Sequence, residues 1–253
     1  MPVRPGFSLP VRSCSHGLCD RLGYDCPRSF VWSKMGWQVL SQGIPKEFWD
    51  DRFSEDGFAY GDRPSRLLLA WADVIRSNCK SALVPACGEG RDAVFLAELG
   101  LQVTALDISI KGLEKTRHLA ASRNVSVETI EADLFKWDWP ENRFDVVATM
   151  FGHMPSAVRP DLHSRYKQSL TPGGFVFLEG FTQDQLTFQK SHNSGGPPDL
   201  DMLYTVQSVR SEFGGLDELS LMTGTETLEE GPYHTGPSAL IRAVYQKPMD
   251  KQD

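Results

Sequence analysis

Ala82-Leu-Val-Pro-Ala-Cys-Gly-Glu-Gly-Arg91, followed by Val103-Thr-Ala-Leu-Asp107, is the stretch of sequence that decides the fold. The apolar residues at its start predict a buried strand of a parallel sheet, which ends in a turn containing two glycines. Residues 92–100 predict a helix that ends at Gly100, and a second strand ends at Asp107. A strand, a glycine turn, a helix and a strand with a final acid form the plan of a nucleoside-binding α/β unit.

The glycines and the acid of this unit are expected to contact different portions of the ligand. Gly88 and Gly90 let the backbone approach a ligand where a Cβ would collide. Asp107 can accept hydrogen bonds from both ribose hydroxyls, although Ile108-Ser109 lead into a helix, so that a helix N-cap is the alternative. The spacing alone also allows NAD, because alanine is tolerated where Ala93 stands at the third glycine of a dinucleotide fingerprint.

Further strands follow in order. Val125–Ile130 predicts a third strand, Phe144–Met150 a fourth, and Leu170-Thr-Pro-Gly-Gly174 turns into a fifth; the last strand is expected over Ala239–Tyr245. This set resembles the class I S-adenosylmethionine-dependent methyltransferases over about residues 45–248. The resemblance implies an α/β, Rossmann-like fold with a mostly parallel seven-stranded sheet and helices on both faces, and S-adenosylmethionine as cofactor.

Six short motifs resemble the tellurite-resistance/thiopurine methyltransferase-like branch of that class. They are Phe48-Trp-Asp-Asp-Arg-Phe53, Phe58-Ala-Tyr-Gly61, Gly88-Glu-Gly-Arg91, Leu178-Glu-Gly-Phe181, Gly195-Gly-Pro197 and Glu230-Gly-Pro-Tyr-His234. The resemblance implies a small cytoplasmic enzyme with a small, soft nucleophile as methyl acceptor. The sequence departs from the wider class at Val84, where an acid is usual, and at Ala86, where a glycine is usual. Cofactor binding is therefore expected to rest more on the backbone amides of the turn.

The cofactor site is predicted beyond the C-terminal ends of the strands. By resemblance, Asp107 would bind the ribose, Asp133 the adenine amino group and the Leu134 amide a ring nitrogen. Arg52 would pair with the methionine carboxylate or with an anionic acceptor, and Arg91 with a carboxylate unless it is a solvated surface residue. The other predicted cofactor residues are Trp49, Tyr60, Gly61, Ala86, Gly88, Gly90, Ile108 and Met150.

Methyl transfer to an anionic nucleophile needs little acid–base help, because proximity and orientation supply most of the catalysis. An alcohol or amine acceptor would need a positioned base. The candidate catalytic residues are His153, His234 and Tyr60, although a histidine in a loop can equally be structural. Two segments are candidate lids, Phe48–Tyr60 and Gln183–Leu203, and packing of the first one's aromatic residues on the sheet is the alternative.

Three rival functions stay open at this point. They are O- or N-methylation of a small metabolite, binding of S-adenosylmethionine or S-adenosylhomocysteine without turnover, and an NAD-dependent oxidoreductase. The last is disfavoured because no Tyr-x-x-x-Lys pair follows the fourth strand. No Asn/Asp-Pro-Pro-Tyr/Phe motif follows it either, which counts against methylation of exocyclic amines in nucleic acid.

Composition agrees with a single enzyme domain over residues 45–248. The net charge of −7 argues against a surface that tracks nucleic acid, and no apolar run approaches the length of a membrane span. The five cysteines are an odd count, which favours a reducing compartment. We therefore expect a cytoplasmic protein with a small-molecule acceptor and neither a nucleic-acid nor a membrane partner; the oligomeric state is not predicted.

Residues 1–44 form a basic, proline-containing extension, and residues 249–253 a short tail. The extension is read as a disordered or non-native tail; a transit segment, or sequence upstream of a start at Met35, are the alternatives. Cys14, Cys19 and Cys26 with His16 match the spacing of no compact zinc knuckle, so no metal is predicted.

Overall fold

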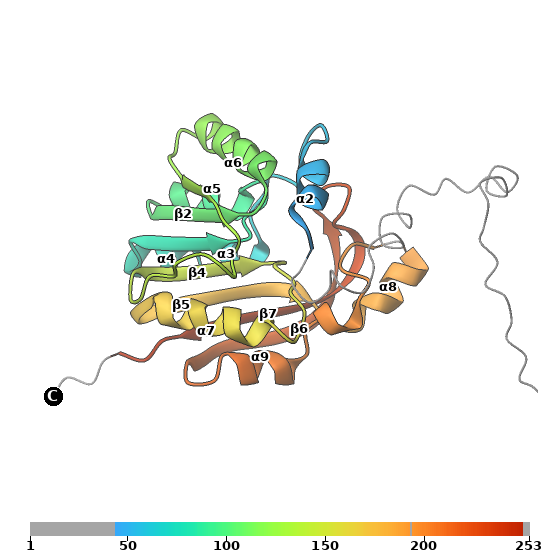
Figure 1. The fold of residues 1–253 in the computed structure, drawn as a ribbon. Coiled ribbons are helices and arrows are strands. Elements are labelled where there is room, and N and C mark those ends of the chain that lie inside the picture. The colour runs from blue at the N-terminus through green and yellow to red at the C-terminus, as the bar shows by residue number, and fades with distance from the viewer. Residues whose placement is uncertain (1–43, 193, 250–253) are drawn as a thin grey trace, which may run out of the picture. The chain divides into compact units, whose positions relative to one another are not determined.

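The computed structural model describes residues 44–192 and 194–249. Residues 1–43, which include Cys14, Cys19 and Cys26, and residues 250–253 are outside the described part, so the predictions for them are not tested. The described elements, in chain order, are α2 (Lys46–Phe53), α3 (Arg66–Ala70), α4 (Ala72–Asn78), β1 (Ser81–Pro85), α5 (Arg91–Glu98), β2 (Gln102–Asp107), α6 (Ile110–Ser122), β3 (Glu128–Glu131), β4 (Phe144–Met150), α7 (Arg159–Ser169), β5 (Leu170–Phe181), α8 (Gln185–His192), the 3₁₀ helix η2 (Leu200–Met202), α9 (Val206–Glu212), β6 (Asp217–Glu229) and β7 (Thr235–Gln246) (Figure 1).

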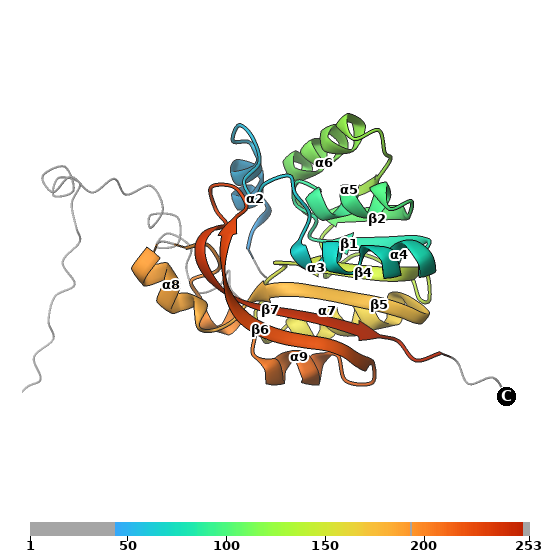
Figure 2. The same cartoon turned by 180° about the vertical axis from the view of Figure 1, so that it is seen from behind.

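The described strands form one sheet of seven, in the order β3-β2-β1-β4-β5-β7-β6. The pairs from β3 to β5 are parallel, whereas β7 runs antiparallel to both β5 and β6. Helices α3, α4 and α5 pack on one face and α7 and α9 on the other, as the two opposite views show (Figure 1 and Figure 2). The predicted fold, with its mostly parallel sheet of seven strands and helices on both faces, is confirmed.

The centre of the sheet explains why its strands are so apolar. Ala82, Leu83 and Val84 of β1, and Val146, Val147 and Ala148 of β4, are at most 2% exposed. Parallel strands with both faces covered form continuous hydrophobic runs rather than alternating ones. The strand order reverses between β1 and β4, and at such a switch a crevice opens beyond the C-terminal ends of the strands.

Several strands differ in their bounds from the sequence prediction: β5 already begins at Leu170, within the predicted turn, and β7 extends beyond Ala239–Tyr245 at both ends. The third strand begins at Glu128 and not at Val125, because the Val125 N–H donates to the Ala120 carbonyl (3.0 Å) and closes the end of α6. Strand β6, which was not predicted individually, is mostly exposed along its length. An edge strand of this kind pairs on one side only, and most of its side chains meet water, so that the hydrophobic pattern carries little signal.

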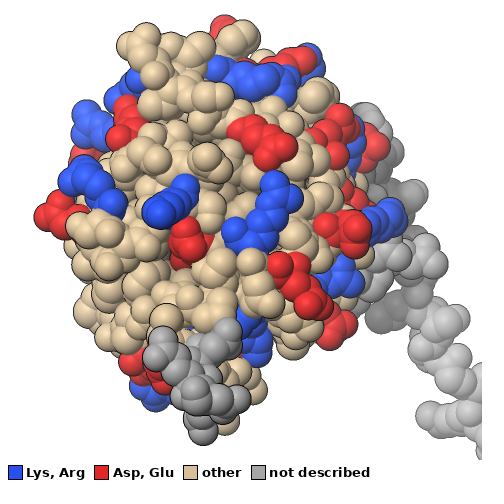
Figure 3. Space-filling view, turned by 90° about the vertical axis from the view of Figure 1, so that its left-hand side faces the viewer, with Lys and Arg blue, Asp and Glu red and all other residues tan. Residues whose placement is uncertain are grey.

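Charges of both signs are mixed on the face that lies to the left in Figure 1. In the space-filling view of that face, Lys and Arg side chains alternate with Asp and Glu (Figure 3). No extended patch of one sign covers this face. This face therefore lacks the continuous basic surface that is typical of nucleic-acid binding.

Candidate functional site

The turn after β1 uses left-handed backbone conformations. Ala86, Gly88 and Gly90 have φ of 51°, 55° and 86°. An L-residue in this region costs about 1–2 kcal/mol, which glycine avoids, so Ala86 holds a strained position where a glycine is usual. Gly90 also has no room for a side chain, because a Cβ there would lie 2.4 Å from Thr116 Cγ2. The turn is therefore packed closely against α6.

Asp107 ends β2 with its carboxylate turned toward the glycine turn. Its Oδ2 accepts the Gly88 N–H at 2.7 Å and its Oδ1 accepts the Ser109 N–H at 2.8 Å. Burial raises the pKa of Asp107 to about 6, although both hydrogen bonds oppose the shift. The helix N-cap alternative does not hold, because the N-cap of α6 is Ser109. Asp107 thus joins the turn to the end of the next strand.

The turn after β3 lies beside the end of β2. The Ala132 N–H donates to the Asp107 carbonyl at 2.9 Å, which brings Asp133 to the same edge of the sheet. Burial raises the pKa of the Asp133 carboxyl, but hydrogen bonds from Lys136 (2.8 Å) and from the Phe135 N–H (3.0 Å) outweigh it and lower the pKa. Two predicted neighbours complete this edge, the buried Leu134 and the half-buried Ile108.

Helix α2 covers the glycine turn. The predicted aromatic helix ends at Phe53, whose ring would lie 3.2 Å from a Cβ at Gly88. Trp49 stacks on Phe53 with ring centroids 5.6 Å apart, and the Ser109 hydroxyl donates to Asp50 at 2.6 Å. The aromatic residues of α2 therefore pack onto the turn.

The loop after α2 is held by Glu89, a residue to which the sequence analysis gave no part. The Glu89 carboxylate is 4% exposed; it accepts the Ala59 N–H at 2.7 Å and pairs with Lys115 at 2.8 Å. The loop ends against Glu230, because a Cβ at Gly61 would lie 3.3 Å from the Glu230 carbonyl carbon. An acid placed between two glycines was the sequence signal for this anchor.

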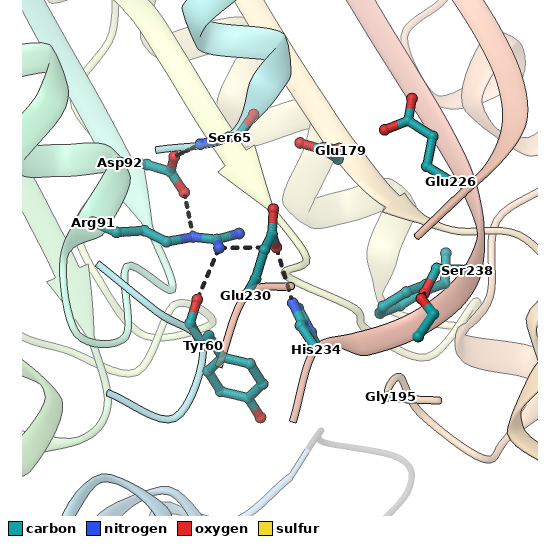
Figure 4. A network of polar contacts seen from close by, with 12 residues as sticks. Tyr60, Ser65, Arg91, Asp92, Glu179, Gly195, Glu226, Glu230, His234 and Ser238 are labelled. Carbon is teal, nitrogen blue, oxygen red and sulfur yellow. Dashed lines mark hydrogen bonds and ion pairs between the residues drawn. The ribbon is translucent and has the colours of Figure 1, made fainter. Parts of the chain in front are cut away.

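Arg91 is buried and links three segments of the chain (Figure 4). Its Nη1 donates to the Tyr60 carbonyl at 2.8 Å and pairs with Glu230 at 2.9 Å, and its Nε lies 3.4 Å from Asp92. The alternative of a solvated surface arginine is wrong. The carboxylates that Arg91 meets belong to the chain itself, so its predicted contact with the cofactor carboxylate stays a prediction.

His234 lies beside this network among aromatic rings. Its ring centroid is 4.5 Å from Tyr60, 4.4 Å from Phe151 and 5.2 Å from Phe181. Its Nδ1 faces the Glu230 carboxylate at 3.5 Å (Figure 4). Burial lowers the pKa of His234, against the opposing effect of Glu230, and keeps the imidazole neutral. The sequence analysis selected His234 but not the two phenylalanines around it.

The end of β4 is strained. Met150, the last residue of the strand, is half-buried, and Phe151 next to it has φ of 57°. Positive φ is a true outlier for a bulky residue and is typical of functional sites. The Phe151 N–H donates to the Glu179 carbonyl at 2.7 Å, which holds the aromatic ring against His234.

His153 is engaged by the backbone on both sides of its ring. Its Nδ1 lies 2.9 Å from the Met202 carbonyl, and its Nε2 accepts the Phe181 N–H at 3.1 Å. Burial lowers the pKa of His153 to about 3. Because neither nitrogen is left for a substrate, the geometry favours a part in holding η2 to β5 over the predicted catalytic part.

The second candidate lid contains a helix and packs against the His234 loop. Gln185, at the start of α8, is fully buried; it donates to the Gly195 carbonyl at 2.7 Å and accepts the Ala239 N–H at 2.8 Å. A Cβ at Gly195 would lie 1.9 Å from the Tyr233 carbonyl oxygen. The described part of this segment is therefore an ordered wall of the site.

The described residues contain neither a metal-ligand cluster nor a helix that could span a membrane. Within residues 44–192 and 194–249, no group of three or more His, Cys, Asp and Glu side chains is arranged to hold a metal ion. The helices of these ranges are all too short or too polar to cross a bilayer.

Comparison with known proteins identifies the class. Residues 82–174 match the family model described as a methyltransferase domain. The chain is 34% identical over 121 residues to probable thiol methyltransferase 2 of Arabidopsis thaliana, over 46% of this chain and 50% of that protein, and so spans half of that relative's length. It is 27% identical over 202 residues to thiocyanate methyltransferase 1 of Brassica oleracea, over 78% of this chain and 82% of that protein.

A solved structure agrees on the fold. The protein reported under "Conversion of a Disulfide Bond into a Thioacetal Group during Echinomycin Biosynthesis" matches with a TM-score of 0.65 and 17% identity, over 82% of this chain and 93% of that one. Residues 82–174 are therefore a methyltransferase domain, and the fold around them is that of the class I S-adenosylmethionine-dependent methyltransferases, whose cofactor is S-adenosylmethionine. The relatives named as thiol and thiocyanate methyltransferases agree with the resemblance of the six short motifs to the tellurite-resistance/thiopurine methyltransferase-like branch.

Proposed function

We propose that the protein transfers a methyl group from S-adenosylmethionine to a small, soft nucleophile, namely a thiol, a sulfide or an oxyanion of selenium or tellurium. The surroundings of His234 carry the proposal. They consist of aromatic rings and of Glu230, whose charge is already paired with Arg91. No described side chain in contact with His234 is an unpaired carboxylate or an amine. Such surroundings suit an acceptor that needs no strong base.

The end of β2 fits the ribose of the cofactor. Asp107 accepts hydrogen bonds from the backbone amides of Gly88, Ser109 and Ile108. A carboxylate has about four lone-pair sites, so that one remains for a ribose hydroxyl. Asp133 and the Leu134 amide would bind the adenine, and the turn from Ala86 to Gly90 would lie against the rest of the molecule. Trp49, Gly61, Ile108 and Met150 would line the same crevice.

When bound, the cofactor supplies a methyl group on a positively charged sulfur. The acceptor sulfur forms the new C–S bond while the old one breaks, and its electron pair stays on the departing sulfur. Holding the two sulfurs in line with the methyl carbon can supply about 7–11 kcal/mol. In this proposal, α2, the turn at Phe151 after β4 and the loop of residues 230–234 hold the two reactants in line.

Protons have a small part in this scheme. Burial raises the pKa of Tyr60 to about 12, so that its side chain stays a phenol and donates rather than accepts a proton. Because burial lowers the pKa of His234, its imidazole is a weak base, so a thiol acceptor would enter the site as its thiolate. An anionic acceptor needs no proton transfer at all. The small-molecule acceptor and the unpaired Cys79 and Cys87 both suit the cytoplasm.

Release of S-adenosylhomocysteine, measured by mass spectrometry, tests the proposal. The acceptor panel contains sulfide, small thiols, selenite, tellurite, a catechol and a small amine. Turnover with the sulfur or chalcogen acceptors alone supports the proposal. Turnover with only the catechol or the amine would instead make the protein a base-assisted O- or N-methyltransferase. Cofactor binding with no turnover on the panel would favour a binding protein that does not transfer the methyl group.

A further inference from the structure

Arg52 carries its positive charge among aromatic side chains of α2 and of the loops that hold Tyr60 and Tyr233. It lies half-buried on α2, and its Nη1 donates to the Tyr60 hydroxyl at 3.0 Å. Its guanidinium carbon lies 3.5 Å from the centre of the Tyr233 ring and 4.9 Å from that of Phe48. These contacts fix the guanidinium in place by cation–π interaction and stacking.

Within the described ranges, Arg52 has no carboxylate partner. The two other arginines near the site are neutralised: Arg91 by Glu230 and Asp92, and Arg242 by Glu179 at 2.6 Å and by Glu226. A guanidinium has five N–H donors, and Arg52 uses one of them on the Tyr60 hydroxyl. A fixed, half-buried cation with unused donors is a binding group for an anion.

The position of this charge points to the acceptor. Tyr60 lies between Arg52 and His234. Its hydroxyl accepts a hydrogen bond from Arg52, and its ring centroid lies 4.5 Å from that of His234. The charge of Arg52 is close enough to contribute to the lowered pKa of His234. Arg52 therefore acts on the region in which the acceptor is expected.

We propose that Arg52 binds the methyl acceptor in its anionic form and makes the site selective for small monoanionic chalcogen nucleophiles such as hydrosulfide and thiolates. This inference rests on the proposed function. In the transfer, the electron pair of the anionic sulfur forms the new bond to the methyl carbon, and the bond to the sulfonium sulfur breaks with its pair left on that sulfur. Both charges disappear together, so an anion desolvated beside Arg52 is well placed to react.

A binding experiment separates this role from contact with the cofactor carboxylate. Calorimetry at one fixed salt concentration measures S-adenosylhomocysteine binding to the full chain, and then thiocyanate binding to the loaded protein. Thiocyanate serves as a monoanionic probe. Arg52→Met should weaken thiocyanate binding by about ten- to a hundredfold, the usual size of one charged hydrogen-bonded contact, and leave S-adenosylhomocysteine binding within about twofold.

Two further variants complete the test. Arg76→Met removes the same charge from the exposed face of α4, where Arg76 pairs with Asp73 at 3.0 Å, and should leave both affinities unchanged. Arg52→Lys keeps the charge but loses the planar fork, and should fall between Arg52→Met and the wild type. Melting curves check that each variant is folded.

Three outcomes overturn the inference: a wild type that does not bind thiocyanate, equal effects of Arg52→Met and Arg76→Met, or an Arg52→Met variant that loses S-adenosylhomocysteine affinity instead. The last would assign Arg52 to the cofactor carboxylate. The proposed function fails separately, through the absence of turnover by the wild type with any sulfur or chalcogen acceptor.

Discussion

Glu230→Gln should destabilise the protein far more than Glu218→Gln, although each substitution removes a carboxylate that lies 2.9 Å from an arginine. The side chains of Arg91 and Glu230 are 8% and 16% exposed, whereas those of Arg210 and Glu218 are 58% and 33% exposed. The two pairs therefore match in distance and differ in contact with water. Burial is the main difference between the two pairs, although Glu230 also faces His234 and Glu218 also accepts the Tyr245 hydroxyl.

The magnitudes follow from that difference. Breaking a buried pair costs about 3–5 kcal/mol, because the remaining charge stays desolvated. Since Arg91 keeps Asp92 at 3.4 Å and glutamine still offers an acceptor oxygen, we expect about 2–3 kcal/mol for Glu230→Gln. An exposed pair is worth about 0–1 kcal/mol, which sets the expectation for Glu218→Gln. Each kcal/mol corresponds to about 2–4 °C in melting temperature for a domain of this size.

Urea unfolding of the full-length variants at neutral pH gives the difference in free energy directly. Burial raises the pKa of Glu230, but His234 and Arg91 outweigh it and lower the pKa below its ordinary value. The pair therefore stabilises the fold above the unfolded-state pKa of about 4.3, and its contribution is lost as the pH falls through the folded-state pKa. The gap between wild type and Glu230→Gln should close in acid. Equal midpoints for the two variants at neutral pH would refute the reasoning.

Three further outcomes are expected. Ala86→Gly should raise the free energy of unfolding by up to about 1 kcal/mol, since it relieves the strain at φ of 51° at a smaller cost in backbone entropy; a lower urea midpoint would contradict it. Gly195→Ala should speed hydrogen exchange in residues 194–198 and 230–234, because its Cβ would collide with the Tyr233 carbonyl, whereas Gly224→Ala has open space and should change nothing. S-adenosylhomocysteine should bind about tenfold more weakly at pH 5 than at pH 7.5, because the Asp107 carboxyl, with a pKa of about 6, must lose its proton to accept a ribose hydroxyl. Calorimetry should find this pH dependence absent in Asp107→Asn, and its persistence there would assign it to another group.

The central strands and the glycine turn were predictable because their signals are local. The run from Ala82 is buried on both faces, and Gly88 and Gly90 stand where the backbone needs positive φ. The fourth strand begins and ends where its apolar run does. Patterns of this kind depend only on neighbouring residues and on burial.

The contacts of the site could not be predicted in the same way. Arg91 and Glu230 are separated by more than half of the chain, and nothing in either local sequence indicates that they form a pair. His153 has the position expected of a rim residue, but the long-range contacts with Met202 and Phe181 occupy its ring. Such roles are set by tertiary neighbours and not by residue type.

The position of Arg91 between Tyr60 and Glu230 has a consequence for synthesis of the chain. On the ribosome, the loop that carries Tyr60 and the turn before α5 emerge long before Glu230, which precedes β7. Until β7 inserts between β5 and β6, Arg91 lacks one of its carboxylate partners and the wall around His234 is missing. Contacts of such long range form late and slowly. A nascent or truncated chain that ends before Glu230 would therefore hold the glycine turn without the surroundings of His234, so that the proposed acceptor site forms only with the last strand of the sheet.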